Sequence, residues 1–347
     1  MYKEQVLAGI AAGRPRIGPQ TVHIDVTNTC NAKCITCWDH SPLLEIPRPQ
    51  SWKQRRLSYD HFEDIVDQLA ELGSVRAIIL SGMGEPLTHP RIYDMIAAVK
   101  AKGWQLMMLS NLVAADIDRL ASSGIDQLLV GVQGVTPGSY TAFHPGWTED
   151  QFFAMCSHLR RLTASGVRVR HVQVINRDTA SEVVAMVRFG KRFHADRVNF
   201  KLASLYGGTE TCSVTPEQRD WLISEGLPAA IALADQLGVR TNLDLFARQL
   251  SAAEGDIRST APIADIGCFM GYAYSRITVD SDVLYCCNTE VQVGSLREDR
   301  FADLWYGDRW NKLRDTLAAG HYFKGCDKCG KLEQNTKWSE RVRAAAK

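Results

Sequence analysis

The sequence lacks any apolar run of the ~18 residues that a membrane-spanning helix requires. Its first segment, MYKEQVLAGIAAGRPRIG, also lacks the apolar core of a secretory signal peptide. The formal net charge is only +1, so no bulk field favours binding to nucleic acid or to an anionic membrane. No repeat with a period of about 20–50 residues and no low-complexity segment is present. These absences predict a cytoplasmic protein without a membrane or nucleic-acid partner.

Cysteine is the residue type that stands out, with ten in 347 residues. Disulfides are rare in reducing compartments, so cysteines clustered a few residues apart indicate a metal site or catalysis. Cysteine is also a small buried hydrophobe, and that interpretation suits Cys156 in the helical stretch QFFAMCSHLRRL. The length suits one large α/β unit plus a smaller module, because domains typically hold about 100–200 residues.

Short apolar runs alternate with amphipathic stretches over residues 21–205. The expected strands are 22–27, 77–82, 105–111, 127–133, 170–176 and 197–203. Apolar residues at three- and four-residue spacing, typical of helices, cover 59–73, 90–103 and 181–195. Strand followed by helix, repeated six times, predicts a parallel sheet with helices outside it. We therefore expect an α/β fold built on a partial (βα)6 barrel, with its chemistry at the carboxyl ends of the strands.

The residues after 205 no longer show the alternation of strands and helices. Thr215 followed by Pro216 is a helix-start signal, and a second helix is expected over 227–238. The segment RITVDSDVLYCC predicts a hairpin that turns at Asp280-Ser281-Asp282. The expected units are an N-terminal extension (1–20), the barrel (21–205), a helical connector (206–262), a small cysteine-rich α+β module (263–335) and a tail (336–347).

Three cysteines, Cys30, Cys34 and Cys37, lie in the segment HIDVTNTCNAKCITCWDHSP just after the first expected strand. We call them the clamp. Three thiolates on one loop can bind three irons of a [4Fe–4S] cluster, which leaves the fourth iron open to a small molecule. Tetrahedral zinc normally takes a fourth Cys or His ligand. His40 is available for that role, so zinc is the competing interpretation.

The C-x3-C-x2-C spacing after a first barrel strand resembles the signature of the radical S-adenosylmethionine (radical SAM) superfamily. The resemblance implies a [4Fe–4S] cluster whose open iron binds the amino and carboxylate groups of SAM. An external one-electron donor such as flavodoxin or ferredoxin then drives cleavage to methionine and a 5'-deoxyadenosyl radical. Thr36 stands where relatives often carry an aromatic residue near the adenine, and Trp38 is the aromatic candidate for that contact here.

The segment SGMGEPL, one strand and one helix after the clamp, resembles the family's GGEP element. Its counterparts are Gly82, Gly84, Glu85 and Pro86. Glycines permit close backbone approach to a ligand, and a carboxylate accepts charge-assisted hydrogen bonds from an ammonium group such as that of the SAM methionine.

Polar residues also end the later expected strands. Ser110 and Asn111 close the third strand and Gln133 closes the fourth, where relatives often contact the ribose or the methionine carboxylate of SAM. Asn176 and Lys201 end the fifth and sixth strands. These two residues either line the same open end of the barrel or cap the strand ends.

A second cysteine group follows residue 263. Spacing alone is compatible with zinc, because four cysteines in two separated pairs suit a tetrahedral ion. The run from CFMGYAYSRITVDSDVLYCC to the final CDKC resembles the SPASM/Twitch extension of radical SAM enzymes. The shorter Twitch form implies one auxiliary [4Fe–4S] cluster, with Cys287 as the alternative to Cys286. The expected ligands are Cys268, Cys286, Cys326 and Cys329.

The resemblances imply an enzyme that abstracts a hydrogen atom from its substrate. In a dehydrogenation the auxiliary cluster accepts the remaining electron. In an epimerisation a thiol returns a hydrogen atom, and Cys212 and Cys287 are the candidates. Asp25 is a candidate for binding an amino group or acting as a base.

We expect a small-molecule substrate, such as a sugar, an aminocyclitol or another natural-product metabolite. Only about 20 residues precede the first strand, too few for the leader-binding domain that peptide-modifying relatives often carry. Modification of a ribosomal peptide, by a thioether or carbon–carbon crosslink or by epimerisation, is the alternative. A zinc-binding structural protein and an iron–sulfur electron carrier are the alternatives from other classes.

Overall fold

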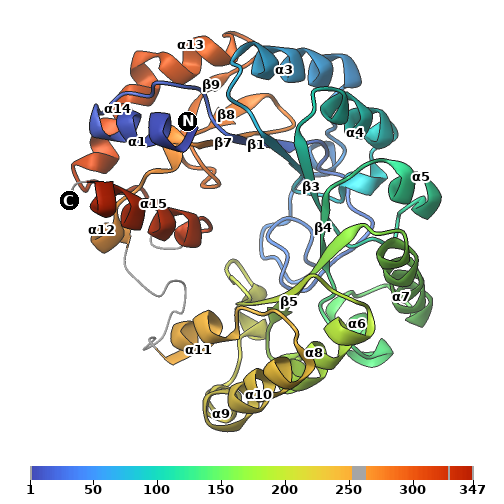
Figure 1. Cartoon of the computed structure of the whole chain (residues 1–347). Helices are drawn as coiled ribbons and strands as arrows, with labels where there is room; N and C mark the ends of the chain where they lie inside the picture. Colours follow the sequence, from blue (N-terminus) through green and yellow to red (C-terminus); the bar gives the residue numbers. More distant parts are fainter. Residues whose placement is uncertain (1, 252–262, 327–328, 346–347) are drawn as a thin grey trace.

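A curved sheet with helices on its outer side forms the body of the protein (Figure 1). The structure, a computed structural model, describes residues 2–251, 263–326 and 329–345. The last part of the expected connector, 252–262, lies outside the described residues. Every helix in the described part of the chain is too short or too polar to cross a membrane.

Six parallel strands form the barrel part of the sheet, in the order β6-β5-β4-β3-β2-β1. They are β1 (Thr21–Asp25), β2 (Ala77–Ser81), β3 (Gln105–Ser110), β4 (Gln127–Gly131), β5 (Arg168–Ile175) and β6 (Arg197–Leu202). Each coincides with an expected strand to within about two residues, so the partial (βα)6 barrel is confirmed.

The outer helices bury the apolar stripes that the sequence pattern predicts. They are α3 (Tyr59–Glu71), α4 (Ile92–Ala101), α5 (Ile117–Ser122), α6 (Pro137–Phe143), α7 (Glu149–Ala164) and α8 (Val183–Arg192). In α3 the Ser58 side chain accepts a hydrogen bond from the His61 backbone N–H, which caps the first turn. Phe62, Ile65 and Leu69, at helical spacing, are then fully buried in the core.

Three further helices follow β6 and add to the helical layer outside it. They are α9 (Pro216–Trp221), α10 (Leu227–Leu237) and α11 (Leu243–Ser251). Thr215 caps α9 through a reciprocal capping box, as its sequence predicts. Phe200 of β6 packs in one apolar cluster with Leu227 and Phe246. The described part of the expected connector is therefore a packed helical layer, and the domain boundaries themselves stay predictions.

The C-terminal strands extend the barrel sheet. β7 (Tyr274–Ile277) pairs parallel to β1, and β8 (Asp282–Leu284) and β9 (Gln292–Ser295) follow as antiparallel neighbours. Ser281 has φ 70° at the turn between β7 and β8, so the expected hairpin is confirmed. Its attachment to the free edge of β1 was not predicted. One continuous sheet consequently carries both cysteine groups.

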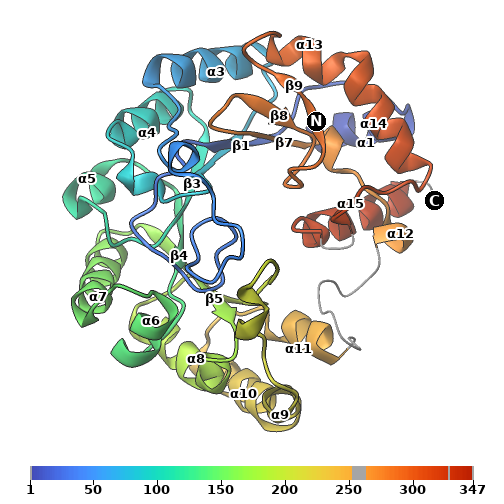
Figure 2. The same ribbon diagram turned by 180° about the vertical axis from the view of Figure 1, so that it is seen from behind.

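Most of the remaining helices gather around this C-terminal part (Figures 1 and 2). They are α1 (Tyr2–Ala11), α12 (Ile263–Ile266), α13 (Phe301–Tyr306), α14 (Asp308–Ala318) and α15 (Leu332–Ala345). The short α2 (Gln50–Lys53) instead contacts the loop after β1, where the Trp52 carbonyl accepts a hydrogen bond from the Asn28 side chain. Helix α1 lies within the expected N-terminal extension. Its buried Val6 packs with Tyr272 and with Trp338 of α15.

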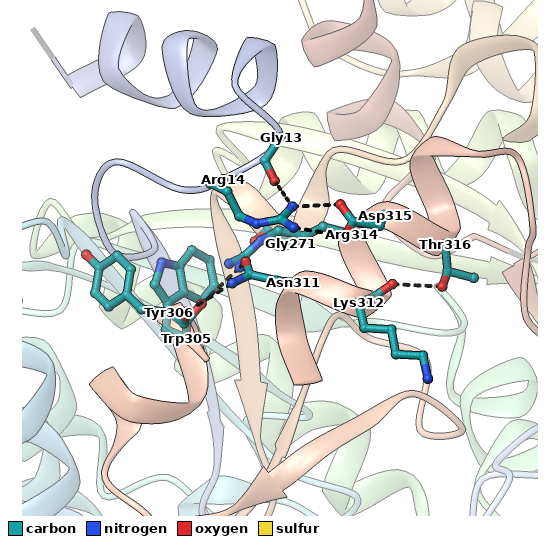
Figure 3. Close-up of polar contacts among 10 residues, drawn as sticks. All are labelled: Gly13, Arg14, Gly271, Trp305, Tyr306, Asn311, Lys312, Arg314, Asp315 and Thr316. Carbon is teal, nitrogen blue, oxygen red and sulfur yellow. Dashed lines mark hydrogen bonds and ion pairs between the residues drawn. The ribbon is translucent and has the colours of Figure 1, made fainter. Parts of the chain in front are cut away.

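Arg314 of α14 is a fully buried cation that fixes this region (Figure 3). Its guanidinium donates hydrogen bonds to the carbonyls of Gly271 at 3.0 Å and Trp305 at 2.9 Å, and to Asn311 Oδ1 at 2.7 Å. The guanidinium carbon also lies 4.8 Å from the ring centre of Trp305. Arg314 therefore joins α13 and α14 to the segment between Cys268 and β7.

We expect Arg314→Gln to lower the free energy of unfolding by ~3 kcal/mol, because it leaves buried carbonyl groups without their charged donor. Urea unfolding followed by circular dichroism measures the change. Arg14→Gln is the matched control, since Arg14 pairs with Asp315 while both side chains are about half exposed, and it should leave stability almost unchanged. Equal stabilities of the two variants would contradict this role for Arg314.

Candidate functional site

The clamp lies on the loop that leaves the carboxyl end of β1. The Ile35 backbone N–H bonds the Phe143 carbonyl at 3.0 Å, which ties the loop to α6. The thiol sulfurs accept backbone hydrogen bonds: Cys30 Sγ from Ala32 at 3.4 Å, and Cys37 Sγ from His40 at 3.3 Å. Such N–H···S contacts suit the thiolate ligands of an iron–sulfur cluster.

Burial raises the pKa values of all three clamp thiols, that of Cys30 to about 12. The negative charges of their neighbours in the clamp raise the pKa values of Cys30 and Cys34 further. Three close thiolates therefore need a positive group such as cluster iron. Among the described residues, no group of three or more His, Cys, Asp or Glu side chains is placed to hold a single metal ion.

The SGMGEP turn packs directly on the loop that carries the clamp. A Cβ atom on Gly82 would lie 2.1 Å from the Thr27 carbonyl oxygen, and one on Gly84 would lie 2.1 Å from that of Thr29. Two backbone hydrogen bonds complete the contact: the Gly84 N–H donates to the Thr27 carbonyl at 3.1 Å, and the Glu85 N–H donates to the Thr29 carbonyl at 2.8 Å. The glycines thus permit close approach of the protein's own backbone, whereas the sequence suggested only a ligand. Side chains at either position would push the two loops apart.

Glu85 connects this turn to the end of β3. Its carboxylate accepts hydrogen bonds from Ser110 Oγ and from the Asn111 backbone N–H, each at 2.7 Å. The Leu87 N–H adds a third bond at 3.1 Å. Burial raises the pKa of Glu85, and these donors oppose the rise because they stabilise the carboxylate. Glu85, Ser110 and Asn111 therefore form one group beside the clamp, as the motif order suggests.

Asn111 also reaches the clamp loop itself, since its Nδ2 donates to Asn31 Oδ1 at 2.8 Å. Two other predicted SAM-binding residues have protein partners. Gln133, in a left-handed conformation with φ 58°, accepts a hydrogen bond from the Val174 N–H at 3.1 Å. Trp38 lies edge-to-face against Tyr206, beyond the end of β6. Their contacts with SAM stay predictions.

The ends of β5 and β6 differ from each other. Asn176 is fully buried and accepts hydrogen bonds from the Asp178 and Thr179 backbone N–H groups. It therefore caps the strand end, the second of the two roles considered for it. Lys201 is exposed and alternates with buried Phe200, so it lies on the inner side of the sheet.

The C-terminal cysteines gather near the amino end of β7. Burial raises the pKa of Cys268 to about 12, and the charges of Cys329 and Cys326 contribute to the rise, so these thiols are neighbours. The amide of buried Asn335, on α15, donates to Cys329 Sγ at 3.6 Å. These sulfurs from three segments fit the auxiliary cluster that the sequence predicts.

Cys286 and Cys287 both belong to this group. Their mutual hydrogen bond raises the pKa of Cys286 and lowers that of Cys287, where the positive charge of Lys331 acts in the same direction. The Asn288 N–H donates to Cys286 Sγ at 3.4 Å. The choice between them as a cluster ligand stays a prediction.

Cys212 lies at the other end of the barrel. It is 1% exposed and packs with Ile35 and Phe143 beneath the clamp. Its thiol donates only a long bond, 3.9 Å, to the Ile35 carbonyl. Cys212 is thus surrounded by apolar core residues. Cys287 instead lies near the charged side chains of Arg276 and Lys331.

Five residues that sequence reasoning did not place together form a buried polar group, which we call the β1–β7 network. Its members are His23, Asp25, Ser81, Tyr274 and Arg276. Arg276 donates to Asp25 Oδ2 through Nε at 2.9 Å and lies 2.8 Å from it through Nη2. His23 Nδ1 bonds Tyr274 Oη at 3.1 Å, and His23 Nε2 bonds Ser81 Oγ. Asp25 is therefore paired with Arg276, which lowers its pKa against the effect of burial.

Two parts of the chain match known protein families. Residues 24–190 match the model of the radical SAM superfamily, and residues 268–330 match that of the SPASM iron–sulfur cluster-binding domain. The chain is 29% identical over 330 residues to the tungsten-containing aldehyde ferredoxin oxidoreductase cofactor-modifying protein of Pyrococcus furiosus, covering 89% of this chain and 86% of that protein. It is 23% identical over 331 residues to a PqqA peptide cyclase of Ruegeria pomeroyi, covering 89% and 80%.

Among solved structures, the fold resembles that of Streptococcus suis SuiB bound to S-adenosylmethionine. The TM-score is 0.65 at 16% sequence identity, and the match covers 95% of this chain and 75% of SuiB. The two family models account for both cysteine groups in the order in which the sequence presents them. The chain therefore belongs to the radical SAM superfamily, with a SAM-binding [4Fe–4S] cluster in its barrel and an auxiliary cluster in a C-terminal SPASM domain.

Proposed function

We propose that this enzyme cleaves SAM reductively at the clamp and oxidises a small-molecule substrate held on the inner side of the barrel sheet. When bound, the clamp cluster supplies the electron that splits SAM into methionine and a hydrogen-abstracting 5'-deoxyadenosyl radical, and the auxiliary cluster takes up the electron that the substrate then loses. The chain's own residues hold these groups in place and shield the reacting atoms from water.

The observation that carries this proposal is the position of the cysteines along one pair of strands. The clamp follows the carboxyl end of β1. Cys268 precedes β7, and Cys286 follows the antiparallel β8, so both lie toward the amino end of β7. A five-residue strand spans roughly 16 Å. A substrate lying along the inner side of these strands would face the SAM site at one end and the auxiliary site at the other.

Dehydrogenation is the outcome that this arrangement favours. Hydrogen abstraction leaves a substrate radical, and loss of a proton and one more electron completes a two-electron oxidation. An epimerisation instead needs a hydrogen atom from a thiol. Cys287 lies beside Arg276 and Lys331 on the inner side, so it is the better placed of the two candidate donors.

The named relatives support two substrate classes. The Pyrococcus furiosus relative, named for modifying a cofactor, supports a small molecule. The Ruegeria pomeroyi relative is a peptide cyclase and supports the second candidate, a ribosomal peptide. For either substrate an external one-electron donor of the flavodoxin or ferredoxin type would reduce the clamp cluster.

Deuterium transfer tests the reaction and the substrate class together. Extracts of cells grown in deuterated medium are first separated into a small-molecule fraction, below about 1 kDa, and a peptide fraction, above about 3 kDa. Each fraction is then incubated anaerobically with reconstituted enzyme, dithionite and SAM. We expect 5'-deoxyadenosine to gain deuterium from the small-molecule fraction. Label from the peptide fraction alone would overturn the small-molecule assignment. Failure to form any 5'-deoxyadenosine would overturn the proposed function.

A further inference from the structure

The SAM-binding turn has a contact with the C-terminal part of the chain that its motif does not explain. Arg276 Nη2 lies 3.5 Å from Met83 Sδ, and Met83 is the residue between Gly82 and Gly84. Arg276 belongs to β7, within the residues that match the SPASM model, whereas Met83 lies within the radical SAM match. The two matched regions therefore meet at this turn.

The turn is also held on its other side. Ser81, directly before Gly82, bonds His23 Nε2, and both side chains are largely buried. Asp25 Oδ1 lies 3.3 Å from His23 Nε2. The residues on both sides of Gly82 are thus connected to the β1–β7 network, Ser81 through His23 and Met83 through Arg276. Glu85 fixes the far end of the turn, as described above.

Arg276 is the member of the network whose chemistry suits this role. Its side chain is 11% exposed, and its counter-ion Asp25 is 1% exposed. A guanidinium has several donors in a fixed plane, so it can hold Asp25 and reach Met83 at once. A lysine would supply the charge without that fork.

We propose that Arg276 is a positioning residue of the SAM site, which fixes the Gly82–Glu85 turn for SAM from the C-terminal domain through Asp25 and Met83. This assignment rests on the proposed function. It makes the SPASM domain part of the SAM-binding apparatus in addition to its role as the site of the second cluster. Without the C-terminal domain, the barrel would therefore lack this support for its SAM-binding turn.

Equilibrium dialysis of radiolabelled SAM against the anaerobically reconstituted enzyme, without reductant, measures this role apart from turnover. We expect Arg276→Gln to raise the Kd for SAM by about tenfold with iron content unchanged, since it removes a charged donor to two partners. Arg276→Lys should show a smaller rise. Arg14→Gln, at an exposed ion pair, is the control and should bind SAM like the wild type.

Electron paramagnetic resonance of the reduced clamp cluster gives a second readout. Addition of SAM should shift the spectrum of the wild type fully and that of Arg276→Gln only in part at the same SAM concentration. If Arg276→Gln fails to fold, Asp25→Asn makes the same test, because it removes the charge of the pair and keeps the side-chain shape. Wild-type Kd values and full spectral shifts in these variants would overturn the proposal. No binding of SAM by the wild type would overturn the proposed function instead.

Discussion

Replacing Cys30, Cys34 or Cys37 with alanine should abolish formation of 5'-deoxyadenosine and remove about four of about eight iron atoms per chain. Each cysteine supplies one of three thiolates on a single loop. A cluster that loses one of these ligands therefore has no other thiolate to take its place. Anaerobic reconstitution, iron and sulfide analysis, and chromatography of the products after addition of dithionite and SAM measure both effects.

Cys156→Ala is the matched control for these variants. Cys156 is a buried thiol in α7 that packs in the apolar core and belongs to neither cysteine group of the sequence. The Cys156→Ala variant should keep the iron content and the SAM cleavage of the wild type. Retention of full SAM cleavage by any of the three clamp variants would contradict the assignment of the first cluster, as would stoichiometric zinc without sulfide in the wild type.

Removal of the auxiliary ligands should separate SAM cleavage from product formation. In Cys268→Ala or Cys329→Ala, about four irons should remain and 5'-deoxyadenosine should still form, because the clamp is intact. The oxidised product should disappear, because the substrate radical no longer has a nearby acceptor for its second electron. The measured quantity is the ratio of product to 5'-deoxyadenosine, with the deuterated fraction that labels the wild type as the substrate source.

The two adjacent cysteines make a further comparison informative. Cys286→Ala and Cys287→Ala differ by one position, and the variant that loses the auxiliary irons identifies the ligand. The other variant should keep them. A product ratio equal to that of the wild type after loss of the auxiliary cluster would rule out an electron-accepting role for it.

The barrel was predictable because its signals are local. Each of the six strands is a short apolar run, and each is separated from the next by a stretch with helical spacing. The clamp and the SGMGEP turn follow two of these strands, and carboxyl ends of parallel strands meet at one edge. The contact of Glu85 with Ser110 and Asn111 follows from that geometry.

The β1–β7 network had no comparable signal. Asp25 and Arg276 are separated by 251 residues, and alternation along one strand does not reveal which distant strand will supply a partner. The pairing of β7 with β1 creates the contact, and that pairing depends on the shape of the whole sheet. Gln133 shows the same limit, since its position predicts a SAM contact but gives no signal of the hydrogen bond that its side chain accepts from Val174 on the neighbouring strand.

The pairing of β7 with β1 also has a consequence for how the chain folds during synthesis. β1 leaves the ribosome about 250 residues before β7, its second neighbour in the sheet. At ~5–20 residues per second, that edge waits roughly 10–50 seconds for its partner. A strand edge without a partner is a template for pairing with other chains. The strand that leads into the clamp is therefore the point at which the nascent protein most needs protection by a chaperone.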